Sequence, residues 1–306
     1  MEQYVIGMDG GGTKTAVSIA DLAGHVLLEL KGGAINCNSE APVHVLENLG
    51  AILDGISAHF GGLDGCAGIC LAAAGISNPT AAETIQAGVA NRYRGPLSIV
   101  GDHEAALCGA VGKPYGIILI SGTGTICFGR DLDGKEHRTG GFGHLIDDGG
   151  SGYAIGRDIL SAVVRASDGR AEKTVLTELV FHELGISSIP GLIRYIYEKE
   201  TGKREIAALA PLLDDACRRG DSAAEKIVKR STDSLLELLF PVIGALHFEK
   251  PEIALCGSIL LRDEFIRNCL FRGIASSFPD AKYYDRKFDA SYGAVLIALE
   301  NGKHRP

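Results

Sequence analysis

The stretch of sequence that decides the fold is residues 4–30, YVIGMDGGGTKTAVSIADLAGHVLLEL. A short apolar run ends in an aspartate and three glycines. A second run, rich in β-branched residues, follows, and a third apolar run begins after a turn at residues 21–24. Such runs, bounded by Gly and Asp, are typical of strands joined by tight turns. The stretch therefore predicts a three-stranded antiparallel meander over residues 4–8, 15–20 and 26–30.

The same pattern returns later in the chain. An apolar run at residues 116–121 ends in Gly-Thr-Gly, and two further strand-like runs cover residues 125–130 and 135–139. Between the two meanders the periodicity predicts alternating helices and strands, at residues 42–59, 67–71, 80–90, 97–100 and 104–111. Alternating helices and strands are typical of α/β layers. We therefore predict an internal duplication with two α/β domains, residues 1–115 and 116–290, and a ligand in the cleft between them.

The second half carries extra helical sequence. Residues 151–247 have a mostly helical pattern, broken by glycines and by Pro190, Pro211 and Pro241, which predicts a helical insertion in this half. A strand, a helix and a second strand follow, at residues 252–256, 263–277 and 282–284. We expect the final helix, residues 291–306, to pack back on the first half. The length of 306 residues also favours two domains over one core.

Composition and charge narrow the classes of partner. The chain has 46% hydrophobic and 22% charged residues, as soluble globular proteins do, and a net charge of −8. An acidic protein is a poor match for nucleic acid or for an anionic membrane. There is no apolar stretch of membrane-spanning length and no basic start followed by an apolar segment, so we predict a cytoplasmic protein. The eight cysteines form no CxxC pair, which predicts reduced core thiols.

The first glycine turn, residues 9–15 (DGGGTKT), has the character of a phosphate-binding turn. Three consecutive glycines are costly to order, and their physical use is to let backbone N–H groups approach an anion. Lys14 and the hydroxyl groups of Thr13 and Thr15 add donors, and Asp9 is suited to a divalent cation such as Mg²⁺. The turn is not a P-loop, because threonine stands where lysine is needed and a strand follows. A plain tight hairpin is the alternative. The predicted nucleotide-binding residues here are Gly11, Gly12, Thr13 and Lys14.

A second glycine turn occupies the corresponding place in the second half. It is Ser121-Gly122-Thr123-Gly124-Thr125, and we predict that Thr123, Gly124 and Thr125 bind the phosphates from the other side of the cleft. A third element, Gly257-Ser258, follows the apolar strand at residues 252–256. It would let an adenine ring approach the backbone, although such a dipeptide is more often a plain strand-to-helix turn.

Asp102 stands at the end of the predicted strand 97–100 and just before a helix. Aspartate is a good helix N-cap, because its carboxylate accepts hydrogen bonds from the first backbone N–H groups. It is equally suited to act as a general base at the edge of a cleft. The residue types alone leave these two interpretations even.

Together with residues 140–153, GGFGHLIDDGGSGY, these segments resemble the N-acetylglucosamine kinase branch of the BadF/BadG/BcrA/BcrD ATPase superfamily. The segments occur in the family's order and spacing, and the resemblance covers nearly the whole chain. It implies a two-domain, actin-like (ribonuclease H-like) ATPase fold. It also implies an ATP- and Mg²⁺-dependent kinase that phosphorylates the 6-hydroxyl of an amino sugar, N-acetylglucosamine first among them. We further expect a homodimer.

The resemblance also carries residue roles. The aspartate that matches Asp102 accepts the proton of the sugar hydroxyl and contacts the sugar, and the residues that match Asn36 and Asp148 bind sugar hydroxyls. The turn that matches Gly122 and Thr123 lies between the sugar and the phosphates. Gly141 completes the predicted sugar-binding set.

Two departures from the family pattern concern the choice of sugar. Phe142 stands where the animal enzyme carries Trp. Residues 72–75, AAAG, stand where the family has a sugar-contacting segment with a serine. The sequence is therefore compatible with N-acetylglucosamine, glucosamine, N-acetylmuramic acid or N-acetylmannosamine. We expect His144 to make a structural hydrogen bond and not to take part in catalysis.

Two other functions are considered. One is an ATPase activator of a 2-hydroxyacyl-CoA dehydratase or benzoyl-CoA reductase, which holds a [4Fe–4S] cluster with cysteines at a dimer interface. None of the cysteines here lies in the kind of glycine-flanked, exposed loop that such a cluster needs, and Cys127 and Cys256 fall in predicted strands. The other is a sugar-sensing regulator with the kinase fold. Such regulators usually carry a DNA-binding extension, whereas here the first strand is predicted from residue 4.

Overall fold

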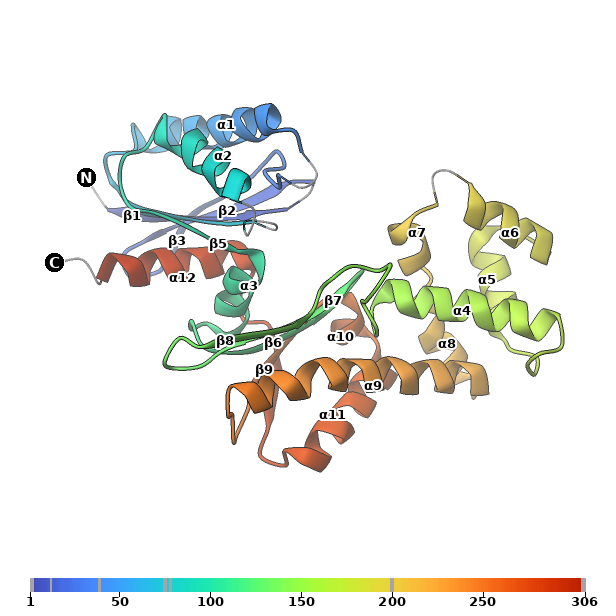
Figure 1. The fold of residues 1–306 in the computed structure, drawn as a ribbon. Helices are drawn as coiled ribbons and strands as arrows, with labels where there is room; N and C mark the ends of the chain where they lie inside the picture. Colours follow the sequence, from blue (N-terminus) through green and yellow to red (C-terminus); the bar gives the residue numbers. More distant parts are fainter. Residues whose placement is uncertain are drawn as a thin grey trace. The chain divides into compact units, whose positions relative to one another are not determined.

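In the computed structural model, residues 3–11, 13–37, 40–73, 76, 79–198 and 201–303 are described. The chain divides into two compact units (Figure 1). The first comprises Met1–Gly116 together with Arg286–Pro306, and the second comprises Ile117–Asp285. Each unit contains a five-stranded sheet with helices, so the predicted α/β class is confirmed.

The sheet of the first unit has the order β3-β2-β1-β4-β5. Its strands are β1 (Tyr4–Gly10), β2 (Thr15–Asp21), β3 (Val26–Gly32), β4 (Cys66–Ala73) and β5 (Leu97–Gly101). β1, β2 and β3 pair antiparallel, which confirms the predicted meander, and β4 and β5 extend the sheet in parallel from β1. The last pair of the β1–β2 ladder joins Gly10 to Thr15, so the first glycine turn projects beyond the ladder.

Helices cover both faces of this sheet (Figure 1). α1 (Pro42–Phe60) and α2 (Pro79–Ala90) bury leucines and isoleucines against one face, and α3 (Asp102–Val111) and α12 (Ala290–Lys303) pack on the other. The second face uses small residues, which bring backbones close. A Cβ at Gly7 of β1 would lie 2.3 Å from the carbonyl oxygen of Ser291, and one at Gly293 would lie 1.9 Å from that of Ala105 in α3. The final helix therefore packs directly on β1 and α3.

The second unit repeats the topology of the first. Its order is β10-β9-β6-β7-β8, so in each unit the first strand lies at the centre, the next two on one side and the last two on the other. The strands are β6 (Gly116–Ser121), β7 (Thr125–Arg130), β8 (Glu136–Gly140), β9 (Glu252–Cys256) and β10 (Lys282–Asp285). Identical strand order in both halves is what the predicted duplication requires.

The predicted helical insertion lies between β8 and β9. It comprises α4 (Gly152–Ser167), α5 (Leu176–Leu184), α6 (Ile189–Tyr197), α7 (Lys203–Ala207), α8 (Leu212–Arg218) and α9 (Ser222–Ala245). After β9 come α10 (Ser258–Arg262) and α11 (Glu264–Ser277), where the sequence predicted a single helix. None of the helices in the described ranges is long and apolar enough to cross a lipid bilayer.

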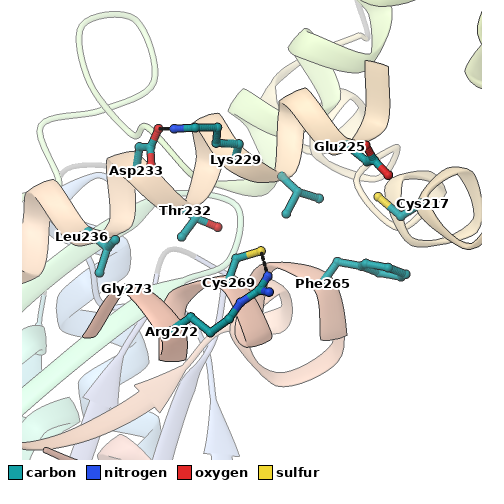
Figure 2. Close-up of a pocket in the computed structure, with 11 residues that line it drawn as sticks. Cys217, Glu225, Lys229, Thr232, Asp233, Leu236, Phe265, Cys269, Arg272 and Gly273 are labelled. Carbon is teal, nitrogen blue, oxygen red and sulfur yellow. Dashed lines mark hydrogen bonds and ion pairs between the residues drawn. The ribbon is translucent and has the colours of Figure 1, made fainter. Parts of the chain in front are cut away.

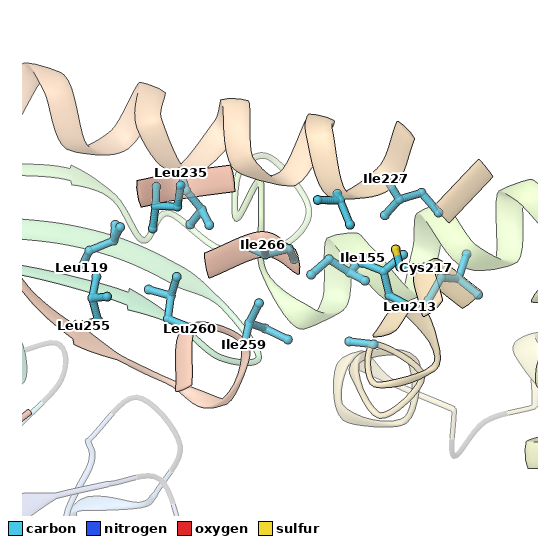
Figure 3. Packing of buried hydrophobic residues seen from close by; sticks show 14 of the residues in the cluster. Leu119, Ile155, Leu213, Cys217, Ile227, Leu235, Leu255, Ile259, Leu260 and Ile266 are labelled. Atoms are coloured by element: carbon cyan, nitrogen blue, oxygen red, sulfur yellow. The ribbon is translucent and has the colours of Figure 1, made fainter. Parts of the chain in front are cut away.

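One predicted helix break is wrong. Pro190 and Pro211 stand at helix starts, but Pro241 lies inside α9. A proline costs the helix a backbone hydrogen bond, which the buried apolar face of α9 offsets. That face points into a continuous core (Figure 3). In this core Leu235 of α9 lies on the side of the sheet, and Ile227 of α9 lies near Ile155 of α4.

Candidate functional site

The first glycine turn presents polar groups at the end of β1. Its backbone closes through a 3.0 Å hydrogen bond from the Gly11 N–H to the carbonyl oxygen of Lys14, and the side chains of Thr13 and Lys14 are exposed. Gly12 lies outside the described residues. The hydroxyl of Thr15 is buried and donates to the carbonyl oxygen of Gly33 at 2.6 Å, so it is not a spare donor as the sequence suggested.

Asp9 lies at the end of β1 in a concentration of negative charge. Burial raises the pKa of its carboxyl from 3.8 to about 6, and the neighbouring carboxylates of Asp102 and Asp289 add to the rise. No lysine or arginine in the described ranges forms an ion pair with Asp9. A divalent cation would relieve this repulsion, and carboxylate oxygens are donors that Mg²⁺ prefers. The donor set therefore fits Mg²⁺. No three His, Cys, Asp or Glu side chains of the described chain could enclose a metal by themselves, so a cation at Asp9 would need further ligands.

Asp102 is not the N-cap of α3. That position is Gly101, and the helix start is held by the Glu104 carboxylate, which accepts from the Gly101 N–H at 2.9 Å. Asp102 is the first residue of the helix, and its side chain is 52% exposed. Its Oδ1 accepts from the backbone N–H of His103 at 2.9 Å. The structure therefore removes the capping interpretation and leaves an accessible carboxylate close to Asp9.

Asn36 lies in the loop after β3, half-buried. Two contacts hold this loop. The side-chain amide of Asn48 donates to the carbonyl oxygen of Ala34 at 2.7 Å, and the buried Ile35 packs so closely that a Cβ at Gly10 would lie 2.5 Å from it. The loop of Asn36 is thus packed against the end of β1, beside the first glycine turn and within the first unit.

In the second unit, Asp148 organises the second glycine turn. This residue is 2% exposed and has a left-handed backbone (φ 65°). Its Oδ1 accepts from the backbone N–H of Thr125 at 3.1 Å, and its Oδ2 forms a 2.8 Å ion pair with Nζ of Lys203. The hydroxyl of Thr125 donates to the carbonyl oxygen of Gly149 at 3.1 Å. Both donors of Thr125 and both oxygens of Asp148 are therefore engaged within the unit, where the sequence expected a phosphate contact and a sugar contact.

Gly257 and Ser258 lie beside the same turn. Gly257 has φ 89°, and a Cβ there would lie 2.2 Å from the carbonyl oxygen of Ser121, so only glycine permits this approach. The structure thus brings the third predicted element next to Gly122 and Thr123.

A cavity of about 410 Å³ opens beside this turn. Residues of the turn, of the start of α4, of α7 and α8, and of α10 line it. They include Thr123, Gly152, Arg204, Ala207, Ser258 and Arg262. The lining is mostly small and apolar, and its charged side chains are two arginines and two aspartates, Asp214 and Asp263. A cavity of this kind is suited to a heterocycle held by a few polar groups.

The remaining predicted residues lie on the segment between β8 and α4. Gly141 has φ 76°, and its carbonyl oxygen accepts from the Arg138 guanidinium at 2.9 Å. Phe142 is 66% exposed. The ring of His144 packs edge-on to that of Tyr153, with centroids 4.7 Å apart, and the described residues include no hydrogen-bond partner for it.

A second cavity contains none of the predicted residues. It is a groove of about 430 Å³ between α9 and α11, where Cys269 faces Thr232 and accepts a 3.0 Å hydrogen bond from Arg272 (Figure 2). Cys217 lies in the same groove but is buried. Six of the eight cysteines are buried, and nowhere in the described part of the chain do cysteines gather into a metal-binding group. The iron–sulfur alternative finds no support here.

Two residues beside these turns escaped sequence analysis. Lys203 is 55 residues from Asp148 along the chain and belongs to the insertion, so no local pattern points to it. Asp289 accepts from the backbone N–H of Tyr292 at 3.0 Å at the start of α12. An aspartate just before a helix is a recognisable N-cap signal. The proximity of Asp289 to Asp9, however, depends on the return of α12 to the first unit, which no local pattern shows.

Comparisons with known proteins agree on one family. Residues 6–298 match the BadF/BadG/BcrA/BcrD ATPase family. The chain is 35% identical to the N-acetylmuramic acid/N-acetylglucosamine kinase of Clostridium acetobutylicum, over 97% of this chain and 98% of that one. It is 29% identical to the N-acetyl-D-glucosamine kinase of Dictyostelium discoideum, over 99% of both chains. Its fold is similar to a Chromobacterium violaceum structure provisionally named an N-acetylglucosamine kinase, with a TM-score of 0.75 and 24% identity over 97% and 99% of the two chains. The chain therefore belongs to the BadF/BadG/BcrA/BcrD ATPase family and has the actin-like ATPase fold.

Proposed function

We propose that this protein is an ATP-dependent kinase that phosphorylates the 6-hydroxyl of an amino sugar, with N-acetylglucosamine as acceptor. One observation carries the proposal. Each of two duplicated units presents a glycine turn between its first two strands, and the second turn adjoins a 410 Å³ cavity. The 35% identity to a kinase of N-acetylmuramic acid and N-acetylglucosamine, over nearly the whole chain, supports the same class of acceptor.

In the proposed reaction, the adenosine occupies the cavity lined by Gly122, Thr123 and Ser258. Each glycine turn would offer backbone N–H groups to the phosphates. Mg²⁺, held by Asp9, would neutralise charge on the phosphates. Asp102 accepts the proton of the sugar hydroxyl while that oxygen forms a bond to the γ-phosphorus. The bond from the γ-phosphorus to the bridging oxygen breaks, and ADP leaves. Phosphoryl transfer depends chiefly on positioning and charge neutralisation, which these residue types supply.

Contacts to the sugar are proposed for Asn36, Gly141 and Asp148. Asp148 would then have to exchange one of its present partners for a hydroxyl. N-acetylmuramic acid is a second candidate acceptor, which the relative from Clostridium acetobutylicum supports. Because its proposed co-substrate is ATP, we also propose that the protein acts in the cytoplasm. A homodimer is the state we expect from light scattering after size-exclusion chromatography.

An acceptor screen tests this proposal. The purified chain is incubated with MgATP and, separately, N-acetylglucosamine, N-acetylmuramic acid, glucosamine, N-acetylmannosamine or glucose, and ADP release is followed. We expect release that depends on an N-acetylated amino sugar. Sugar-independent ATP hydrolysis together with stoichiometric iron would instead support the activator function. Sugar binding without any ADP release would support the regulator.

A further inference from the structure

We propose that Lys203, carried by the helical insertion, binds the phosphates of the nucleotide at the second glycine turn. This inference rests on the proposed function and extends it by one residue. The first turn contains a lysine of its own, Lys14, whereas the second, Ser121–Thr125, contains no basic residue. The fold supplies the missing cation from a segment that has no counterpart in the first unit.

The ammonium group lies against the backbone of the turn. Nζ of Lys203 is 2.8 Å from Oδ2 of Asp148, whose other oxygen accepts from the Thr125 N–H. A Cβ on Gly124 would lie 3.1 Å from this Nζ and 3.0 Å from Oδ2 of Asp148. Glycine at this position therefore leaves room for the ion pair against the backbone of the turn.

The helix that carries Lys203 is held closely against α4. A Cβ at Gly156 of α4 would lie 2.0 Å from the carbonyl oxygen of Ile206, so the two backbones touch. At the start of α7, the Glu205 carboxylate accepts from the Gly202 N–H at 2.8 Å. These contacts fix the base of the lysine side chain and limit the entropy lost when it binds a ligand.

Lys203 has donors left for a ligand. Its side chain is 29% exposed, whereas that of Asp148 is 3% exposed, so Lys203 is the accessible member of the pair. Within the described part of the chain, the ammonium group of Lys203 has one partner, Asp148. An ammonium group carries three donors, so two of them remain for a ligand. A lysine binds phosphate as a point charge. The next residue, Arg204, lines the cavity that we assign to the nucleotide.

Neutralising Asp148 is the competing role for Lys203, because a buried carboxylate left without a cation is strongly destabilising. Lys203→Gln keeps a donor for Asp148 and removes the charge. We expect calorimetry on the full chain to give about 10- to 100-fold weaker binding of MgATP to this variant, as for loss of one hydrogen bond to a charged group.

Three controls accompany this measurement. Adenosine affinity should stay within about twofold, since adenosine has no phosphate, and Lys203→Arg should recover part of the ATP affinity. Lys229→Gln, the same change in an exposed ion pair on α9, is the control and should bind ATP normally.

The double variant Lys203→Gln, Asp148→Asn separates binding from folding. It contains no buried charge, so its melting temperature should return toward that of the unaltered protein while its ATP affinity stays low. If ATP affinity returns with stability, or if adenosine binding falls as much as ATP binding, Lys203 is structural and the inference is wrong. Equal ATP affinity in the Lys203→Gln variant and the unaltered protein would also overturn it. An unaltered protein that binds no ATP would overturn the proposed function as well.

Discussion

At the residue scale, Asp102 is the side chain whose two interpretations the structure separates. Capping of α3 belongs to Gly101 and Glu104, so Asp102→Asn should keep the melting temperature within a few degrees. Loss of a general base typically lowers turnover by about 10²–10⁴-fold. Steady-state kinetics should therefore show this fall in kcat, with the affinity for ATP retained.

The matched variant is Glu104→Ala, which removes the side chain that holds the helix start. It should lower the melting temperature more than Asp102→Asn does. A variant Asp102→Asn that keeps more than about a tenth of its turnover would exclude the general-base role.

Asp9 makes a prediction about pH. Burial raises the pKa of its carboxyl to about 6 in the folded protein, against 3.8 for an aspartate in the unfolded chain. Between pH 3.8 and pH 6 the folded state therefore binds more protons than the unfolded state, and the stability of the protein falls as pH rises. Without divalent cations, Asp9→Asn should match the unaltered protein in melting temperature near pH 4 and melt higher by about 2–5 °C above pH 6.5. Adding Mg²⁺ with ATP should stabilise the unaltered protein more than the variant. A stability difference that does not change with pH would contradict this assignment.

Asn36 is proposed to bind sugar only. Asn36→Ala should raise the KM for N-acetylglucosamine by the equivalent of about 1–3 kcal/mol, the usual cost of a lost hydrogen bond in a buried site. The KM for ATP should change little. A shift in the KM for ATP, with the KM for sugar unaltered, would move Asn36 to the nucleotide.

At the element scale, most helices and strands could be predicted from the sequence, because the patterns that indicate them lie within each segment. Residues 4–30 contain the apolar and β-branched runs and the turns with Asp and Gly that define β1, β2 and β3, and each strand ends within two residues of its predicted limit. Pro241 was misread, because what keeps α9 continuous is burial of its apolar face in a core assembled from distant segments. The separate helix α10 was missed for the same reason, since Gly257 turns the chain against the second glycine turn.

The contact of Gly257 with this turn predicts a strong effect of a small change. Gly257→Ala must place a Cβ 2.2 Å from the carbonyl oxygen of Ser121 and holds alanine at φ 89°. We expect a lower melting temperature and weaker ATP binding, because the wall of the cavity has to move. Gly244→Ala in α9, where a Cβ meets nothing within 4 Å, is the control. It should leave stability equal or raise it by up to about 1 kcal/mol. Equal behaviour of the two variants would show that α10 tolerates displacement.

At the scale of the whole molecule, the duplication was predictable and its additions were not. Repetition of the meander with its glycine turn is visible in the sequence, and the identical strand orders of the two sheets follow from it. The return of α12 to the first unit was expected, but the charge that Asp289 thereby brings to Asp9 was not. The pairing of Lys203 with Asp148 joins residues 55 apart, and it depends on the packing of α7 on α4, which no local pattern in the sequence indicates.

The central claim is that the γ-phosphoryl group passes from ATP to an amino sugar on this protein. Mass spectrometry after incubation with N-acetylglucosamine, Mg²⁺ and ATP labelled with ¹⁸O on its terminal phosphate measures this transfer directly. We predict an N-acetylglucosamine phosphate that retains the three labelled non-bridging oxygens, and none with Asp102→Asn at the same enzyme concentration and time. Labelled inorganic phosphate with unmodified sugar would contradict the account.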